Sequence, residues 1–324
     1  MKYNEFNHKI WLNEFLTASR AGHGFKELRA AIFQDTVSFV NSGGYRLQGQ
    51  DVFINSDANL ENRIEHKPKV CAVASNTEYF TQPAKLAANS NPHETKYSVI
   101  EADCLETAEL LLKAGFNPCV LNMASGKNPG GGVLKGSGAQ EENLFRRTNL
   151  FKSLYQFVDY AAEYGVVRSA RSYPLDRNSG GIYSGAITVF RASENNGYAL
   201  LKKPYQVSFV SVPAINRPEL ETINGIYYIA KPLVEPTKEK IRTILRIAGI
   251  YNHDSLILSA FGCGAYANPP NHIALLFKEV FLEDEFINRF KLIVFSIIDD
   301  HNSHRDHNPD GNVLPFAEVF AHVQ

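Results

Sequence analysis

From Tyr97 to the C-terminus, short apolar segments of strand length alternate with segments of helical spacing, and this alternation limits the possible folds most. The apolar segments are residues 97–102, 118–123, 186–191, 205–213, 255–261 and 291–298. The helical segments include residues 105–115, 237–250 and 271–281, the last with Asn271 as its expected N-cap. Strands that are apolar on both faces are typical of sheets covered by helices on both sides. The pattern predicts an α/β fold, a three-layer α/β/α sandwich with a mixed central sheet.

The beginning of the chain has a different pattern. Helical spacing runs from about His8 to Phe39, with an interruption near Gly22 and Gly24, and residues 45–56 look like a hairpin. A further helix is expected after Gln140, and the glycine-, serine- and arginine-rich residues 165–185 are expected to form a long surface excursion. We therefore predict a mainly helical N-terminal extension, residues 1–40, followed by one α/β domain, residues 41–324.

Composition excludes several classes of function. The net charge of the 324-residue chain is −1 at pH 7, so no strong overall field attracts it to nucleic acid or anionic membranes. No run approaches the roughly 18 apolar residues of a membrane span. The four cysteines have no paired spacing and indicate reduced thiols in a cytoplasmic compartment. A secreted effector is an open alternative.

A glycine-rich loop follows the apolar segment 118–123. Gly130, Gly131 and Gly132 lack side chains, so their backbone N–H groups can approach a ligand closely. Consecutive amides that point to one side form an anion-binding nest, and a diphosphate is the expected ligand. The alternative is a tight turn that needs glycine for its geometry alone.

A second glycine-rich loop, Gly262 to Pro270, follows the apolar segment 255–261. Gly262, Gly264 and Ala267 match the G-x-G-x-x-A spacing of dinucleotide-binding folds. That interpretation is weakened because residues 268–270 separate the loop from its helix, and because the match stands alone. Two such loops after two strands favour one extended phosphate ligand.

Two acids, Glu141 and Glu142, stand directly after the first loop, at the start of the expected helix. Adjacent helical residues point about 100° apart, so the two can border one pocket but cannot share one role. One acid beside a bound diphosphate is suited to general acid catalysis, and the other to holding sugar hydroxyls. The alternative is an acidic first turn that complements the helix dipole. No P-loop pattern is present, nor the acidic run of magnesium-dependent nucleoside-diphosphate hydrolases.

The stretch NMASGKNPGGGVLKGSGAQEE, residues 122–142, resembles the signature of microbial-type poly(ADP-ribose) glycohydrolases, which are macrodomains carrying a GGG-x(6–8)-QEE motif. Seven residues, 133–139, separate the glycines from Gln140 in this chain. SVPAIN (211–216) and FGCGAYANPP (261–270) also resemble the family's strand end and second phosphate loop. Met123, Gly126 and Tyr266 depart from the family's usual residues. The similarity extends from about Val40 to the C-terminus.

The resemblance implies a macrodomain-like domain that hydrolyses O-glycosidic ribose bonds and releases ADP-ribose. Glu142 would be the catalytic acid/base, Glu141 would bind the distal ribose, and Asp103 would bind the adenine amino group. The substrate-binding residues would be Asp103, Asn122, Asn128, Gly130, Gly131, Gly132, Gln140, Gly262, Cys263, Gly264, Ala265 and Tyr266. The implied partners are ADP-ribose, poly(ADP-ribose) and ADP-ribosylated proteins, and no cofactor or metal is implied. A mono-ADP-ribosyl-protein hydrolase and a non-catalytic ADP-ribose reader are the alternatives.

Residues 299–312 gather three histidines and four aspartates. Because they lie among loop-forming residues, we expect a solvated, mobile loop rather than a metal site.

Overall fold

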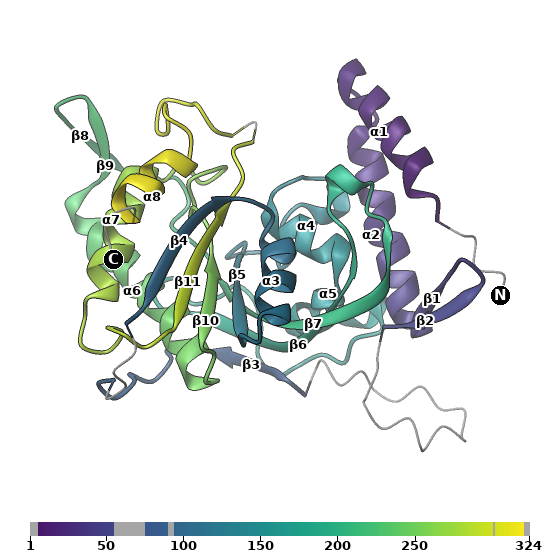
Figure 1. The fold of residues 1–324 in the computed structure, drawn as a ribbon, viewed down its shortest axis with the longest axis horizontal. Coiled ribbons are helices and arrows are strands. Elements are labelled where there is room, and N and C mark those ends of the chain that lie inside the picture. Colours follow the sequence, from purple (N-terminus) through teal and green to yellow (C-terminus); the bar gives the residue numbers. More distant parts are fainter. Residues whose placement is uncertain (1–5, 55–74, 90–93, 301, 321–324) are drawn as a thin grey trace. The chain divides into compact units, whose positions relative to one another are not determined.

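The computed structural model describes residues 6–54, 75–89, 94–300 and 302–320. Its α-helices are α1 (His8–Ala21), α2 (Phe25–Ser42), α3 (Cys104–Lys113), α4 (Gln140–Arg147), α5 (Leu150–Leu154), α6 (Lys231–Ile250), α7 (Pro270–Phe281) and α8 (Val313–Phe320). Its strands are β1 (Gly44–Leu47), β2 (Gln50–Phe53), β3 (Thr77–Phe80), β4 (Lys96–Glu101), β5 (Pro118–Met123), β6 (Gly181–Arg191), β7 (Leu200–Val212), β8 (Leu220–Ile223), β9 (Ile226–Ile229), β10 (Ser255–Leu258) and β11 (Leu292–Ile297) (Figure 1).

Seven strands form the central sheet, in the order β3-β6-β7-β5-β10-β11-β4 (Figure 1). The pairs from β7 through β5, β10 and β11 to β4 are parallel. Neighbouring strands β6 and β7 are joined by residues 192–199, which is too short for a parallel crossover. The sheet is therefore mixed, as predicted, and the expected α/β class is confirmed.

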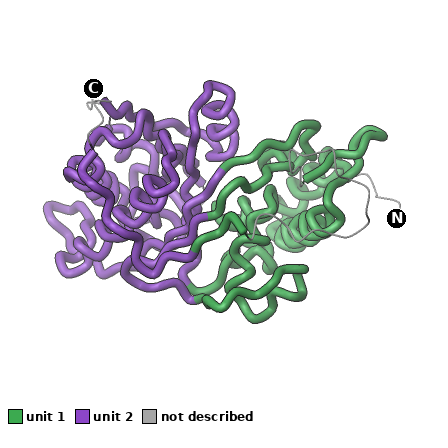
Figure 2. The backbone as a smooth tube through the Cα atoms, turned by 90° about the horizontal axis from the view of Figure 1, so that it is seen from below, with its two compact units in different colours: residues 1–78, 127–173, 184–207 green, residues 79–126, 174–183, 208–324 purple. Residues whose placement is uncertain are grey.

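The chain divides into two compact units, which Figure 2 colours separately. Unit 1 comprises residues 1–78, 127–173 and 184–207, and unit 2 comprises residues 79–126, 174–183 and 208–324. Both N-terminal helices belong to unit 1, together with the loop and helix that carry the predicted catalytic acids. The N-terminal helices are part of unit 1, in which α2 packs as described below. A separate extension of residues 1–40 stays a prediction.

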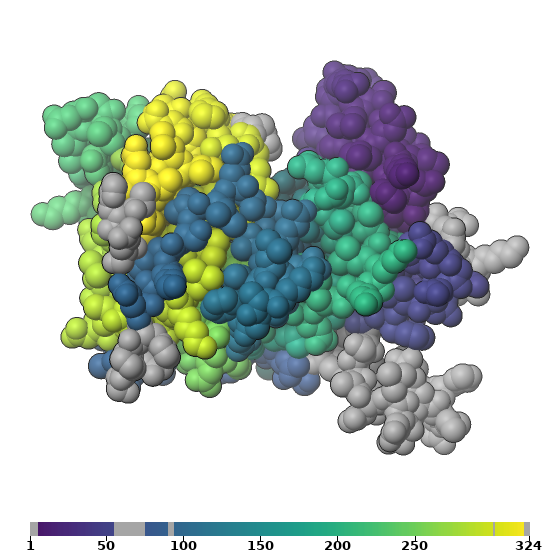
Figure 3. Space-filling model, viewed as in Figure 1, coloured from purple at the N-terminus to yellow at the C-terminus, as the bar shows by residue number. Residues whose placement is uncertain are grey.

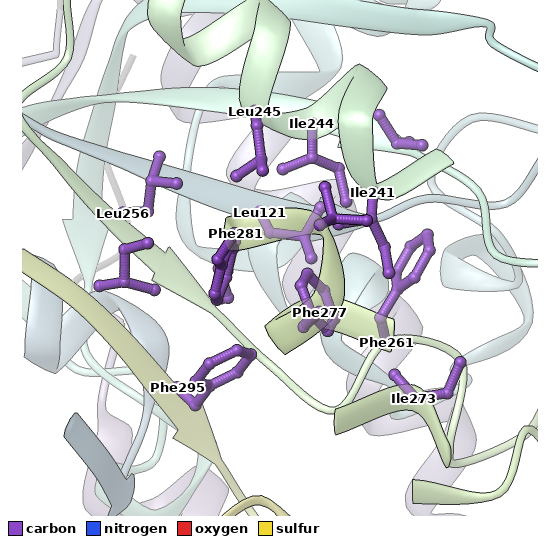
Figure 4. Packing of buried hydrophobic residues seen from close by; sticks show 14 of the residues in the cluster. Leu121, Ile241, Ile244, Leu245, Leu256, Phe261, Ile273, Phe277, Phe281 and Phe295 are labelled. Atoms are coloured by element: carbon purple, nitrogen blue, oxygen red, sulfur yellow. The ribbon is translucent and has the colours of Figure 1, made fainter. Parts of the chain in front are cut away.

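The core of unit 2 follows from the alternation of side chains along its strands. Leu121 of β5, Leu256 of β10 and Phe295 of β11 point to one face, where they meet α6 and α7 (Figure 4). Their strand neighbours Val120, Ile257 and Val294 are buried on the opposite face, where α3 packs. The helix α6 presents Ile241, Ile244 and Leu245 to the first face, at the spacing expected for an amphipathic helix (Figure 4). Strands and helices thus form three layers within this unit.

The core of unit 1 is aromatic. Phe33 of α2 lies within ring-contact distance of Phe145, Phe151 and Tyr155. The α1 helix, at the surface in Figure 3 (purple), packs Trp11 against Tyr198, with 5.1 Å between ring centroids. The predicted helical segment and hairpin at the start of the chain are confirmed, with a break where Gly22 takes a left-handed φ of 77°.

Three local predictions differ from the structure. The helix after Gln140 is interrupted at Thr148 and Asn149, because the Asn149 side chain accepts from Thr188 N at 2.8 Å and Thr148 bridges to Val189 of β6. The expected surface excursion of residues 165–185 ends earlier, because β6 begins at Gly181 and is buried. Asn271 is wrong as an N-cap, since α7 already begins at Pro270 and the Asn271 amide donates to Tyr227 O.

Two further observations concern the whole described chain. Cys104, Cys119 and Cys263 are buried and form no disulfide among the described residues, while Cys71 lies outside those residues. Among the helices of the described residues, none is long and apolar enough to cross a membrane.

Candidate active site

The first glycine-rich loop is a succession of tight turns in unit 1. Gly131 N donates to Asn128 O at 3.0 Å, and Val133 N donates to Gly130 O at 3.0 Å. Gly130 and Gly131 have φ values of 77° and 54°, in the left-handed region that favours glycine. The conformation of this loop therefore depends on glycine at these two positions.

Side chains of α4 lie directly over the glycines. A Cβ atom at Gly130 would lie 2.6 Å from the ring of Phe145, and one at Gly131 would lie 2.5 Å from Glu142 Oε1. Real Cβ atoms do not approach other atoms so closely, so the missing side chains leave room for α4 to pack on the loop. Glycine at these two positions therefore allows the close packing of Phe145 and Glu142 as well as the turns of the loop.

Glu141 and Glu142 are both buried, with exposed fractions of 3% and 7%. Gly130 N donates to Glu141 Oε1 at 3.0 Å, and Gly132 N donates to Glu142 Oε1 at 2.8 Å. Hydrogen bonds to a charged acceptor are among the stronger ones in proteins. Since the two side chains leave α4 in different directions, each carboxylate is held by its own glycine.

The second oxygen of Glu142, Oε2, is buried and has no hydrogen-bond partner among the described residues. An unsatisfied buried polar atom costs about 1–3 kcal/mol, so its presence calls for a functional explanation. Because Oε1 is fixed by Gly132, Oε2 is the atom through which this carboxyl group can exchange a proton with a ligand. That geometry is suited to a general acid/base.

The amide groups of the three glycines are already occupied within the protein. Gly130 N and Gly132 N bind the two carboxylates, and Gly131 N binds the carbonyl of Asn128. The diphosphate nest expected from this loop would need these same N–H groups. The three glycines stay predicted as substrate-binding residues, but in this structure the amides of Gly130 and Gly132 hold the two acids and the amide of Gly131 closes a turn with Asn128 O.

Tyrosines lie beside Glu141. Burial raises the pKa of Tyr155, and the nearby Tyr160, Tyr164 and Glu141 raise it further. Burial also raises the pKa of Tyr160, and Glu141 contributes here too. Both phenols therefore keep their protons at neutral pH and can only act as hydrogen-bond donors or neutral acceptors.

The other predicted substrate-binding residues outside the second loop lie in different elements of the two units. Asn128 lies exposed before the glycines, and Gln140 is the first residue of α4. Asn122, in unit 2, is fully buried at the end of β5 and donates to Ser211 Oγ at 3.0 Å. Asp103, also in unit 2, caps α3, where its Oδ1 accepts from the amides of Leu105 and Glu106. Their roles toward a substrate stay predictions.

The second glycine-rich loop belongs to unit 2 and is organised by one side chain. Asn268 is fully buried, and its Nδ2 donates to Ile215 O at 2.8 Å, Gly262 O at 3.1 Å and Tyr266 O at 3.2 Å. A Cβ at Gly262 would lie 2.6 Å from Asn268 Nδ2, so glycine allows this close approach. The side chain thereby fixes the loop without using the loop's amides.

The amides of the second loop contrast with those of the first. Gly264 N and Ala265 N donate to no group within the described residues. Gly264 is half-buried and Ala265 is exposed. These consecutive N–H groups are available to an anion, and the phosphate-binding role of this loop stays a prediction.

The histidine- and aspartate-rich segment packs on the second loop. His307 Nε2 donates to Cys263 O at 2.8 Å, and Asn308 Nδ2 lies 3.4 Å from the same oxygen. Asp299 Oδ1 accepts from Ser303 Oγ and from Asn312 N at 2.7 and 2.6 Å. Residues 300, 304–306, 309 and 310 are exposed, as expected for a solvated loop, whereas Ser303, Asn308 and Asn312 are buried by these polar contacts. The mobility of the loop stays a prediction. No cluster of potential metal ligands occurs among the described residues, and His301 lies outside them.

Sequence reasoning missed three residues beside the first loop. Arg29 of α2 lies against Gly138, Arg146 of α4 donates to Ser137 O at 2.8 Å, and Glu194 binds Arg29. Of these three, only Arg146 could have been recognised from the sequence, because it is a basic residue four positions after Glu142 and therefore lies on the same helix face.

The chain is similar to known proteins. Residues 33–192 match a family model described as "Microbial-type PARG, catalytic domain". Poly(ADP-ribose) glycohydrolase from Thermomonospora curvata bound to the inhibitor ADP-HPD is 29% identical, with a TM-score of 0.68, covering 90% of this chain and 99% of that chain. The structure of the same enzyme described without the inhibitor has a TM-score of 0.69.

A more distant relative shares the fold. Poly(ADP-ribose) glycohydrolase from Deinococcus radiodurans in complex with ADP-ribose is 23% identical, with a TM-score of 0.57 over 80% of this chain and 100% of that chain. A search of curated proteins finds no match.

Proposed function

Because residues 33–192 match the family model of the microbial-type PARG catalytic domain, and the chain is similar to the poly(ADP-ribose) glycohydrolase of Thermomonospora curvata, we propose that it is such a glycohydrolase, which hydrolyses the O-glycosidic ribose–ribose bonds of poly(ADP-ribose) and releases ADP-ribose. The observation that carries this proposal is the state of Glu142. Its carboxyl group is buried, held through one oxygen by Gly132 N, and unpartnered among the described residues at the other. An ADP-ribose reader without catalysis has no need for such a residue.

In the first step, protonated Glu142 gives its proton through Oε2 to the oxygen that links two riboses. The bond between that oxygen and the anomeric carbon breaks, and the ring is left as an oxocarbenium-like species. General acid assistance of this kind contributes about 10²–10⁴ in rate. The hydrogen bond from Gly132 N keeps Oε1 in place, so that the proton leaves from one defined atom.

In the second step, the Glu142 carboxylate takes a proton from water, whose oxygen attacks the anomeric carbon. ADP-ribose leaves with a hydroxyl group at that carbon, and Glu142 is again protonated. Glu141 is proposed to hydrogen-bond the distal ribose while Gly130 N holds its Oε1. One acid thus performs both proton transfers, and its neighbour orients the sugar.

The other site residues are proposed to bind the remainder of ADP-ribose. Gly262, Cys263, Gly264, Ala265 and Tyr266 would hold the diphosphate, for which the amides of Gly264 and Ala265 are available. The substrate roles are proposed also for Asp103 at the adenine and for Asn122, Asn128, Gly130, Gly131, Gly132 and Gln140 around the sugar. The buried cysteine thiols of the described residues, which form no disulfide, support a reducing, cytoplasmic compartment.

The test is to measure ADP-ribose release from poly(ADP-ribose) by the wild type and by Glu142→Gln. We expect the variant to lose about 10²–10⁴ in turnover, the range of general acid/base assistance, with ADP-ribose affinity within a few-fold. Glu163→Gln, an exposed glutamate of unit 1, is the matched control and keeps full activity. Equal losses of binding and turnover would make Glu142 structural.

A substrate panel separates the polymer from other ADP-ribose linkages. Proteins that carry a single ADP-ribose on Glu, Ser or Arg are compared with the polymer at equal ADP-ribose concentration. Faster release from the polymer is expected. Release from a singly modified protein alone would assign the chain to mono-ADP-ribosyl hydrolysis.

A further inference from the structure

Ser137 presents a hydroxyl group beside the first glycine-rich loop, close to Glu142. A Cβ atom at Gly132 would collide with Ser137 Oγ and would lie 3.6 Å from Glu142 Oε1. The hydroxyl and the carboxyl oxygen therefore border the same small space over Gly132. Ser137 is half-buried, and its Oγ makes no hydrogen bond within the described residues. A polar group of a ligand that enters this space can reach this hydroxyl.

The backbone around Ser137 is fixed from several sides. Ser137 N donates to Gly132 O at 3.2 Å, and Ser137 O accepts from Arg146 Nη2 at 2.8 Å. Gly136 has a left-handed φ of 71°, and a Cβ there would collide with the carbonyl oxygen of Lys26 in α2. The fold of unit 1 therefore determines where the Ser137 hydroxyl lies.

Arg146 of α4, which binds Ser137 O, is fully buried and yet forms no ion pair within the described residues. Its Nε donates to Tyr198 Oη at 2.8 Å, and its Nη1 has no partner among those residues. A buried charge without a counter-charge is costly, so the stability of unit 1 does not explain this arginine. The backbone group that it holds is the carbonyl of Ser137.

The groups around this space are suited to a sugar hydroxyl. A serine hydroxyl both donates and accepts hydrogen bonds, as a ribose hydroxyl does. Glu142 Oε1 accepts from Gly132 N, and a carboxyl oxygen can accept a second hydrogen bond. A ribose hydroxyl over Gly132 can therefore donate to Glu142 Oε1 while it accepts from Ser137 Oγ. A negatively charged group is less suited to this space, because the Glu142 carboxylate repels it.

Resting on the proposed function, we propose that Ser137 is a specificity-determining residue whose hydroxyl binds a hydroxyl of the distal ribose, and that Arg146 is the positioning residue that holds Ser137 in place. The ribose is thereby bound at Oε1 of Glu142, which leaves Oε2 available for the bond that is cleaved. A ligand that lacks this ribose hydroxyl loses the contact with Ser137, so the residue favours ribose over deoxyribose.

The first experiment measures ADP-ribose binding by calorimetric titration, which needs no turnover. Wild type and Ser137→Ala are titrated with ADP-ribose and with two analogues that lack the 2- or the 3-hydroxyl of the distal ribose. For one analogue, we expect the preference for ADP-ribose to be about two- to tenfold larger in the wild type than in Ser137→Ala, the range of one hydrogen bond. Ser38→Ala, at an exposed serine of α2, is the control and keeps the wild-type preference. Equal preferences in wild type and Ser137→Ala for both analogues would overturn the proposal.

The second experiment tests Arg146 through the same preference. Lysine keeps the charge but lacks the fork of donors with which Arg146 reaches Ser137 O and Tyr198 Oη. Arg146→Lys is expected to lose part of the preference for ADP-ribose over the analogue, and to cause no further loss when Ser137 is already alanine. Tyr198→Phe removes the acceptor of Arg146 Nε and should act in the same direction, which provides a second variant if Arg146→Lys does not fold. A merely structural arginine would lower the melting temperature and leave the preference unchanged, and this result would overturn the positioning role.

These titrations separate the inference from the proposed function. If the wild type shows the preference and Ser137→Ala loses it, but no ADP-ribose substrate is cleaved, only the proposed function fails. If the wild type releases ADP-ribose from the polymer but the preferences of wild type and Ser137→Ala are equal, only the role of Ser137 fails. A wild type that binds no ADP-ribose would contradict both.

Discussion

The two glycine-rich loops have similar compositions, but they use their backbone amides differently. In the first loop, Gly130 N and Gly132 N are engaged by Glu141 and Glu142. In the second, Gly264 N and Ala265 N have no acceptor within the described residues. Glycine serves in one case to seat acids and in the other to expose donors.

This difference shows that the function of a glycine-rich loop depends on what packs against it. The helix α4 follows the first loop after seven residues and presents two carboxylates to it. The second loop is followed by residues 268–270, where the buried Asn268 binds the loop's carbonyl oxygens instead of its amides. A carboxylate accepts hydrogen bonds and therefore occupies the backbone N–H groups of its loop. The side-chain NH2 of an asparagine donates to carbonyl oxygens and leaves the backbone N–H groups available.

Alanine substitutions, one in each loop, are expected to show the largest difference in turnover between the two loops. In Gly131→Ala, the new Cβ collides with Glu142 Oε1 and the residue keeps a left-handed φ of 54°. We expect turnover to fall by about 10²–10⁴, as for loss of a general acid. In Gly264→Ala, the nearest atom to the new Cβ is Asn302 Cβ at 3.7 Å, and activity should stay within a few-fold.

Steady-state kinetics and thermal melts of both variants provide the check. Gly131→Ala is expected to fold, with a strain of about 1–3 kcal/mol. If the two variants lose activity equally, the distinction between the loops fails.

Asn268→Ala should weaken the second loop. Three carbonyl oxygens lose their shared donor, so we expect the free energy of unfolding to fall by about 1–3 kcal/mol. ADP-ribose affinity should fall more than kcat, because the acids of the first loop are untouched. Denaturant unfolding and ADP-ribose titration measure the two effects, with Asn271→Ala, a half-buried residue of α7, as control. A loss of kcat at unchanged affinity would contradict this assignment.

His307→Ala should have the smallest effect. It removes one of two donors to Cys263 O, and Asn308 keeps its contact. A single hydrogen bond is worth about 1 kcal/mol, so ADP-ribose affinity should fall by less than about tenfold. Calorimetric titration measures this change, and no change in affinity would show that the segment does not support the loop.

Much of the fold could be predicted because it depends on local pattern. Apolar runs such as residues 118–123 and helical spacing such as that of residues 237–250 are read directly from the sequence, and the sheet is built from them. The break of the helix at Thr148 was not predictable, since it depends on Thr188 and Val189 of β6, far along the chain. Likewise, the cap of α7 was misplaced because Asn271 finds its acceptor in β9.

The candidate site could be predicted as a motif but not as a set of contacts. Spacing pointed to Glu141 and Glu142, yet it gave no indication that the glycine amides would bind them, because that depends on left-handed turns in the folded loop. Arg29 was missed because its partner Glu194 lies 165 residues away in sequence. Long-range ion pairs leave no periodic signal that a single sequence can reveal.

The most direct measurement is amide hydrogen exchange, followed by NMR with and without ADP-ribose. The account predicts that Gly130 and Gly132 are protected already in the free protein, and that Gly264 and Ala265 become protected only when ADP-ribose binds. Rapid exchange at Gly130 and Gly132 in the free protein, with protection appearing there rather than at Gly264 and Ala265 on binding, would contradict it.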